Sequence, residues 1–270
     1  MGAREQQGGP IADRRRSLDV RLYDLIHRGN PGDARFYVDA CRGARAILEI
    51  GCGTGRILGA LLGAGLDAVG IEVDPDRADA ARTRLAAIDG GVRGRVVQAD
   101  LLELDLGRRF DRVIAPYNVM YALLDDDALA RGLSAVRDHL EVGGRFVFDG
   151  YLVDPREIPG TDEPGRPAEP LVTVQDGPDV VRVFESSRWG PERGRVDVTY
   201  TFHVRGSEAD VEVRTQTIRH RFRSPEEIRT ALAANGLRVV DGPDLRGPRG
   251  HGSWFTMTAE LRRDTAPPPS

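Results

Sequence analysis

The stretch ILEIGCGTGRIL, residues 47–58, decides the fold of this chain. Its first four residues are apolar except for Glu49, which is typical of a short strand buried inside a sheet. Three glycines follow at every second position, and an apolar helical pattern begins after them. Glycine lets the backbone turn sharply and lets a ligand approach where a Cβ would collide. The stretch therefore predicts a strand, a ligand-binding turn and a helix whose first amides attract an anionic group.

The spacing of these glycines distinguishes between ligands. The pattern is G-x-G-x-G, and Arg56 stands where the dinucleotide fingerprint G-x-G-x-x-G has its last glycine. Glu49 lies two residues before Gly51, where a carboxylate would repel a pyrophosphate but would attract a cationic amino group. The loop therefore favours a ligand with an amino-acid end over a dinucleotide.

Strand-like and helical segments alternate around this loop. We expect strands at Ala46–Ile50, Ala68–Glu72, Val96–Gln98, Arg112–Ala115 and Arg145–Asp149. We expect helices at Arg56–Leu62, Pro75–Ala87 and Asp127–Leu140, with a further helix opened by a capping box at Ser224. Two closing strands are expected at Leu237–Val240 and Ser253–Leu261. The alternation predicts an α/β fold with a doubly wound, mostly parallel, seven-stranded Rossmann-like sheet.

The pattern changes after Gly150. Residues 154–170 are rich in proline, glycine and acids, and we expect them to form a loop. Arg195–Val204 alternates strictly, with Val196, Val198, Tyr200 and Phe202 on one face, and Val180–Glu185 and Val211–Arg221 are similar. This period of two predicts a small antiparallel β insertion with one wet face, acting as a lid on the substrate side.

These patterns divide the chain into five segments. Residues 1–16 are expected to be a disordered arm, and residues 264–270 a disordered tail. Residues 17–150 form the predicted ligand-binding core with N-terminal lid helices. The antiparallel insertion is expected at 151–222, and residues 223–263 are expected to complete the core sheet.

Composition excludes several classes of protein. No apolar run approaches the roughly 20 residues of a membrane helix, and no signal peptide is visible, so we expect a cytoplasmic enzyme. A formal net charge of -4 argues against nucleic acid as a partner. All 38 basic side chains are arginine, which excludes lysine Schiff-base chemistry. Two cysteines without companions predict neither a disulfide framework nor a metal site.

Acidic residues stand at the ends of the next two predicted strands. Glu72 ends the second strand, where a carboxylate accepts hydrogen bonds from two ribose hydroxyls. Asp100 follows the third strand and suits an adenine amino group, with Val73 and Leu101 flanking the ring. Because the carboxyl ends of parallel strands meet at one edge of the sheet, we expect these residues around one ligand.

Together these segments resemble the class I S-adenosylmethionine (SAM) methyltransferases. ILEIGCGTGRIL is similar to the glycine motif of that family, GIEVDP to its ribose motif, QADLLEL to its adenine motif and LEVGGRFVFD to its fifth-strand segment. The resemblance implies that Glu49 and the glycine loop hold the amino-acid end of SAM, Glu72 the ribose and Asp100 the adenine. The predicted cofactor residues are Tyr23, Glu49, Gly51, Cys52, Gly53, Thr54, Gly55, Arg56, Glu72, Val73, Asp100, Leu101, Pro116 and Tyr117.

The N-terminal segment, the PYNVMYALLDD stretch and the late insertion resemble small-molecule members, such as sugar N-methyltransferases and glycine- or sarcosine-type N-methyltransferases. This layout implies methylation of a nitrogen or oxygen nucleophile on a small molecule, of natural-product, sugar or amino-acid type. The expected partners are a small-molecule acceptor and SAM, with no nucleic acid, membrane or metal. Whether the chain forms a homodimer stays open.

Candidates for the reaction site follow from position and chemistry. Tyr117 and Asn118 directly follow the fourth strand and are expected to line the site. His27 and His220 are the candidate bases, since imidazole titrates near neutral pH. Arg219 and Arg221 alternate with a third arginine, Arg223, and could bind an anionic group of the substrate. The predicted substrate residues are Tyr37, Asn118, Tyr121, Tyr151, Arg219 and Arg221.

Three other classes of protein predict different sequence features. A nicotinamide-dependent oxidoreductase would carry the fingerprint G-x-G-x-x-G, which is missing. An RNA or protein methyltransferase would favour a basic stripe or a peptide groove. A non-catalytic SAM-binding protein stays open, because loss of a catalytic group need not disturb cofactor binding.

Overall fold

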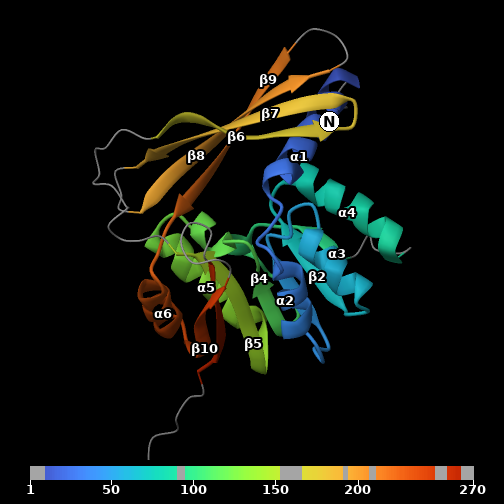
Figure 1. The fold of residues 1–270 in the computed structure, drawn as a ribbon. Coiled ribbons are helices and arrows are strands. Elements are labelled where there is room, and N and C mark those ends of the chain that lie inside the picture. Colours follow the sequence, from blue (N-terminus) through green and yellow to red (C-terminus); the bar gives the residue numbers. More distant parts are fainter. Residues whose placement is uncertain are drawn as a thin grey trace, which may run out of the picture.

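The computed structural model describes residues 10–89, 95–152, 166–190, 194–206, 211–246 and 254–262. These residues form two sheets, a large sheet flanked by helices and a smaller antiparallel sheet that stands beside helix α1 (Figure 1). Among the residues described, no helix is long and apolar enough to cross a membrane.

The large sheet has seven strands in the order β10-β11-β5-β4-β1-β2-β3. The strands are β1 (Ile47–Ile50), β2 (Ala68–Glu72), β3 (Val96–Gln98), β4 (Phe110–Ala115), β5 (Leu140–Tyr151), β10 (Leu237–Arg246) and β11 (Trp254–Leu261). Strands β1 to β5 pair in parallel, whereas β11 is antiparallel to both β5 and β10. The predicted α/β fold with a mostly parallel sheet is confirmed.

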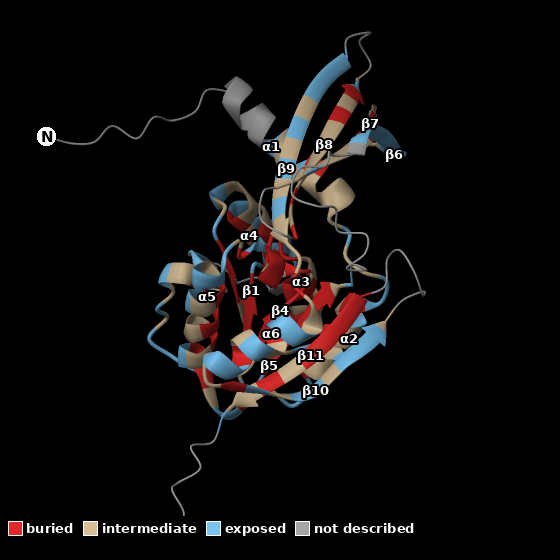
Figure 2. Ribbon diagram, turned by 90° about the vertical axis from the view of Figure 1, so that its left-hand side faces the viewer, coloured by how far each residue is buried: buried red, intermediate tan, exposed pale blue. Residues whose placement is uncertain are grey.

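Helices cover both faces of this sheet. The flanking elements are α2 (Asp33–Ala40), α3 (Arg56–Gly63), α4 (Pro75–Asp89), α5 (Asp126–His139) and α6 (Pro225–Ala234), with short 3-10 turns η2 (Leu101–Glu103) and η3 (Val119–Ala122). α2, α3 and α4 pack in one apolar cluster on one face, and α5 and α6 pack in another on the opposite face. Figure 2 shows that buried residues concentrate in the strands of this sheet.

Capping residues near each N-terminus determine where helices α4 and α6 begin. The Asp74 carboxylate accepts a hydrogen bond from the Arg77 amide, and Pro75 is the first residue of α4. Ser224 and Glu227 form the predicted capping box of α6. Each cap satisfies amides that the first turn of a helix leaves without intrahelical partners.

The smaller sheet has the order β6-β7-β8-β9. Its strands are β6 (Arg166–Asp176), β7 (Asp179–Trp189), β8 (Arg195–Arg205) and β9 (Val211–Arg221). One face carries Val181, Val183, Phe202 and Val204, which pack with Leu22 of α1 (Pro10–Ile26). The sheet is therefore held on the core partly through α1, and β9 also contacts η3.

The structure differs from the expected elements at helix α1 and at strand β6. Helix α1 begins at Pro10, so residues 10–16 of the expected arm are helical, while residues 1–9 and the expected tail lie outside the described residues. β6 begins at Arg166, inside the segment expected as a loop. The strand was not predicted because it contains Pro167 and Pro170, and proline cannot donate a hydrogen bond to a neighbouring strand. Proline is tolerated here because β6 lies at the edge of the sheet.

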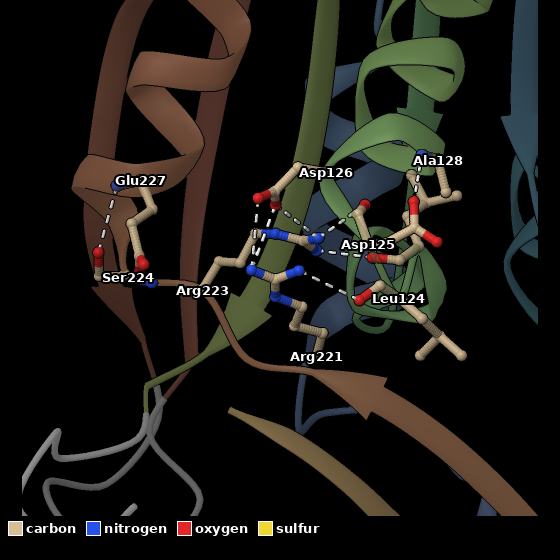
Figure 3. A network of polar contacts seen from close by, with 9 residues as sticks. Leu124, Asp125, Asp126, Ala128, Arg221, Arg223, Ser224 and Glu227 are labelled. Atoms are coloured by element: carbon tan, nitrogen blue, oxygen red, sulfur yellow. Dashed lines mark hydrogen bonds and ion pairs between the residues drawn. The ribbon is translucent and has the colours of Figure 1, made fainter. Parts of the chain in front are cut away.

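A network of arginine contacts joins the end of β9 to the turn before α5 (Figure 3). Buried Arg223 donates to the carbonyls of Leu123 at 2.7 Å and Asp125 at 3.0 Å. Arg221 makes longer contacts, to the Leu124 carbonyl at 3.5 Å and the Asp126 carboxylate at 3.4 Å. Because a guanidinium offers several donors in a fixed plane, Arg223 ties two carbonyls of one turn together.

We expect Arg223→Met to lower the free energy of unfolding by about 2–4 kcal/mol, since the buried Leu123 carbonyl and the part-buried Asp125 carbonyl lose their donor. The matched variant Arg221→Met should cost less than about 1 kcal/mol, because the Arg221 contacts are longer and more exposed. Urea denaturation of both variants measures the difference. Equal losses would show that the turn does not depend on Arg223.

Candidate active site

A cavity of about 610 Å³ lies at the carboxyl ends of the parallel strands, between the large sheet and the insertion. A smaller cavity of about 70 Å³ adjoins it at the glycine loop. The predicted residues that line the large cavity are Tyr23, His27, Gly51, Glu72, Val73, Asp100, Leu101, Tyr117, Asn118, Tyr151, Arg219 and His220. The predicted residues Glu49, Cys52, Gly53, Thr54, Arg56 and Pro116 line the smaller one.

Two glycines of the loop are needed for space and backbone conformation. Gly51 has φ +65, and a Cβ there would lie 2.8 Å from a Val119 methyl group. Gly53 has φ +55, and a Cβ there would lie 3.1 Å from the Tyr23 hydroxyl. Because L-residues rarely adopt these angles, a side chain would strain the loop as well as crowd the cavity.

Glu49 is a buried carboxylate at the end of the smaller cavity. Within the described part of the chain its Oε2 has no hydrogen-bond partner. Burial raises the pKa of Glu49 to about 8, against an opposing effect of the Arg56 charge. A desolvated carboxylate that lines a cavity fits a cationic group of a ligand, such as the ammonium of an amino acid.

Glu72 lines the large cavity and already holds three partners. One oxygen accepts from the Gly53 amide at 3.0 Å. The other accepts from the Asp74 amide and from the Arg77 guanidinium. Arg77 donates through both Nε and Nη2, so Oε1 accepts three hydrogen bonds and Oε2 only one. The predicted role towards ribose hydroxyls would use the remaining lone pair of Oε2, and it stays a prediction.

The glycine loop is tied to the N-terminal segment by polar contacts. Arg56 makes two parallel hydrogen bonds to Asp33, at 2.7 and 2.8 Å. The Thr54 hydroxyl donates to the Asp24 carboxylate. Gly55 lines neither cavity, and its missing Cβ instead allows close packing against Ala81 of α4. Two loop residues thus orient the segment that closes the site.

A strained turn follows β4. Tyr117 and Asn118 both have positive φ, at 59° and 64°, which side-chain-bearing residues seldom adopt. The buried Asp149 carboxylate accepts hydrogen bonds from both of their amides, at 2.9 and 2.8 Å. The Asn118 side-chain carbonyl in turn accepts from the Tyr151 amide. Asp149 therefore holds the turn that presents Tyr117 and Asn118 to the cavity.

His27 stacks on Tyr23, with ring centroids 3.9 Å apart. Its Nδ1 lies 3.0 Å from the Tyr23 carbonyl. A carbonyl only accepts, so Nδ1 carries the proton and Nε2 presents a lone pair. Burial lowers the pKa of His27 to about 4, so the ring is neutral at pH 7.

His220 reaches the cavity from the insertion. Its Nδ1 lies 3.0 Å from the Tyr151 hydroxyl. Burial lowers the pKa of His220 to about 4 as well. Both candidate bases are therefore brought to one cavity in the neutral state, where they act as hydrogen-bonding groups rather than as cations.

Three residues predicted to bind substrate do not line either cavity. Tyr37 is fully buried, and its hydroxyl donates to Asp149 at 2.9 Å. The Tyr121 hydroxyl donates to the backbone carbonyls of Tyr151 and Arg223. Arg221 faces the turn before α5. Their roles in substrate binding stay predictions, and in this structure each polar group holds the frame of the site.

Sequence reasoning missed Asp149, Arg77 and Tyr200. Asp149 was visible as the lone acid closing an apolar strand at the ligand-binding edge of the sheet. Tyr200 was visible as the polar member of an apolar strand face, and it lines the large cavity. Arg77 could not be singled out from the sequence, because its helix contains several arginines and the pattern does not show which of them points into the cavity.

Glu49→Gln should flatten the dependence of stability on pH. Between the ordinary pKa of 4.5 and the folded value of about 8, the folded protein keeps a proton that the unfolded chain has lost. Stability therefore falls as pH rises through this window, and a neutral glutamine removes that part of the fall. Chemical denaturation at about pH 5 and about pH 8 measures it. The exposed control Glu103→Gln should leave the slope of stability against pH unchanged. An unchanged slope in Glu49→Gln as well would contradict a raised pKa for Glu49.

Comparisons with known proteins agree with the geometry. A family described as a methyltransferase domain matches residues 47–144. A dTDP-3-amino-3,4,6-trideoxy-alpha-D-glucopyranose N,N-dimethyltransferase of Streptomyces venezuelae is 29% identical over 249 residues, covering 88% of this chain and 97% of that protein. A dTDP-3-amino-3,6-dideoxy-alpha-D-glucopyranose N,N-dimethyltransferase of Streptomyces fradiae is 29% identical over 254 residues, covering 90% and 92%.

A solved structure shows the same architecture. The sugar N-methyltransferase KedS8 from Streptoalloteichus sp ATCC 53650 matches with a TM-score of 0.69 and 25% identity, covering 97% of each chain. The predicted fold class and SAM cofactor are confirmed by these matches. Residues 47–144 thus match a methyltransferase domain, and over most of its length the chain is similar to sugar N-methyltransferases.

Proposed function

We propose that this methyltransferase transfers a methyl group to the amino nitrogen of a sugar carried on a nucleotide. The observation that carries the proposal is a pair of adjoining cavities in which acidic residues at the strand ends lie next to a chamber lined by tyrosines and histidines. The full-length relatives named above act on dTDP-linked amino sugars, which supports this acceptor class. The cytoplasmic location expected from the sequence is part of the proposal, and the oligomeric state stays open.

The residues around the two cavities fit SAM. Unpartnered Glu49 suits the ammonium of its amino-acid end, and the loop at Gly51 and Gly53 leaves room for close approach. Glu72 lines the large cavity, where it would hold the ribose. Asp100 lines the large cavity, where it would meet the adenine between Val73 and Leu101.

When bound, SAM supplies an electrophilic methyl carbon on a sulfonium, and a C–N bond forms as the C–S bond breaks. The protein needs no covalent intermediate, so its own contribution is to hold the acceptor in line and to exclude water. Tyr117 and Asn118, fixed by Asp149, form one wall for this purpose. With a pKa of about 4, neither His27 nor His220 is a strong base, so the amine must lose its proton largely to solvent.

The activity is tested directly with SAM and a dTDP-linked 3-amino sugar. Mass spectrometry should show acceptor gaining one and then two methyl groups, whereas the matching 3-hydroxy sugar should stay unmodified. SAM binding without methylation of any amino-sugar acceptor would refute the proposal and favour a non-catalytic SAM-binding protein.

Glu72→Gln should weaken SAM binding about tenfold, because glutamine replaces a hydrogen-bond acceptor by a donor. Calorimetric titration gives the dissociation constant, with the exposed Glu103→Gln as a matched control that leaves it unchanged. NADH should give no heat of binding with either protein. An unaltered SAM affinity in Glu72→Gln would remove this residue from the cofactor site.

A further inference from the structure

The face of the insertion that looks into the cavity carries a tyrosine backed by a carboxylate. Tyr200 of β8 lines the large cavity, and Glu185 of β7 is its direct partner across the antiparallel ladder. Directly opposed side chains in such a ladder lie close enough to touch. This pairing places the Glu185 carboxylate beside Tyr200, where it is available as the acceptor for the hydroxyl hydrogen.

This contact decides the hydrogen-bonding character of Tyr200. A phenol has one hydrogen to donate, and an ionised carboxylate can only accept. With its hydrogen given to Glu185, the Tyr200 oxygen presents only lone pairs to the cavity. Burial, together with the charge of Glu185, raises the pKa of Tyr200, so the hydroxyl keeps its hydrogen.

A second acceptor stands beside it. The ring of His27 lies edge-on to Tyr200, with centroids 6.4 Å apart at 71°. Since the Nδ1 hydrogen of His27 is used by the Tyr23 carbonyl, its Nε2 is also an acceptor. Two acceptors from different parts of the fold, α1 and the insertion, therefore face one chamber.

We infer that Tyr200, positioned by Glu185, accepts one N–H of the acceptor amine while His27 accepts another, so that the nitrogen lone pair points at the methyl donor. This inference rests on the proposed function. A primary amine is tetrahedral, with one carbon, two hydrogens and one lone pair. Fixing both hydrogens leaves only one direction for the lone pair, which is the orientation that in-line transfer needs.

The same pair of acceptors distinguishes amines from alcohols. A hydroxyl group has a single hydrogen and can satisfy only one of the two acceptors. The second acceptor would then be buried without a hydrogen-bond donor. An unpaired buried acceptor costs free energy, and this cost discriminates strongly between substrates. Tyr200 and His27 thus select for nitrogen acceptors, whereas Glu185 is a positioning residue that acts through Tyr200.

The test uses the full-length chain and two acceptors, the primary amino sugar and its mono-N-methyl derivative. Tyr200→Phe should lower the kcat for the primary amine about tenfold. The effect on the monomethyl amine should be small, because its single N–H can still bond to His27. SAM affinity and melting temperature should not change, and Thr201→Val, on the opposite face of β8, should leave both rates intact.

Glu185 is tested by its two replacements. Glu185→Gln keeps an oxygen that accepts the Tyr200 hydrogen, and it should retain most of the rate with the primary amine. Glu185→Ala lets the hydroxyl rotate, and its loss should match that of Tyr200→Phe. Equal loss on both acceptors in Tyr200→Phe, or no rescue by glutamine, would overturn the inference. Failure of the proposed function is seen separately, as a wild-type protein that methylates neither amine.

Discussion

A buried carboxylate at the end of the fifth strand holds the reaction site together. Asp149 accepts hydrogen bonds from the amides of Tyr117 and Asn118 and from the hydroxyl of Tyr37. Burial of this charge is costly and raises the pKa of Asp149 to about 6, and the three donors offset part of that cost. In return, two residues are held in a left-handed conformation that neither would adopt alone, and they face the cavity.

The cavity is electrostatically divided. On the side of the glycine loop the cavity carries carboxylates, which suit a ligand with positive charge. The nearby guanidinium groups already form ion pairs, Arg56 with Asp33 and Arg77 with Glu72. On the side of the insertion it carries neutral tyrosine and histidine side chains together with Arg219. The glycine-loop side therefore suits a cationic cofactor, and the insertion side suits an amine that must present a free lone pair. The two sides are brought together because the insertion packs over the sheet.

Much of the fold was predictable from local patterns. The strands β1 to β4, the helices α3, α4 and α5 and the alternation in β8 follow from apolar periodicity and capping residues, which depend on near neighbours in the sequence. The strand β6 was missed because its prolines contradict the local pattern for a strand, and only its position at the sheet edge makes them tolerable.

The sequence by itself determined the fold class, the glycine loop and the acids at the strand ends, because a ligand-binding edge requires those residue types at fixed places in the chain. Tertiary structure alone decided which polar side chains face the cavity. Tyr37 and Arg221 turned out to support the frame, whereas Tyr200 faces the site with Glu185 behind it. The reason is physical, since a hydroxyl or guanidinium serves ligand or frame according to its nearest partner, and that partner lies far away in the sequence.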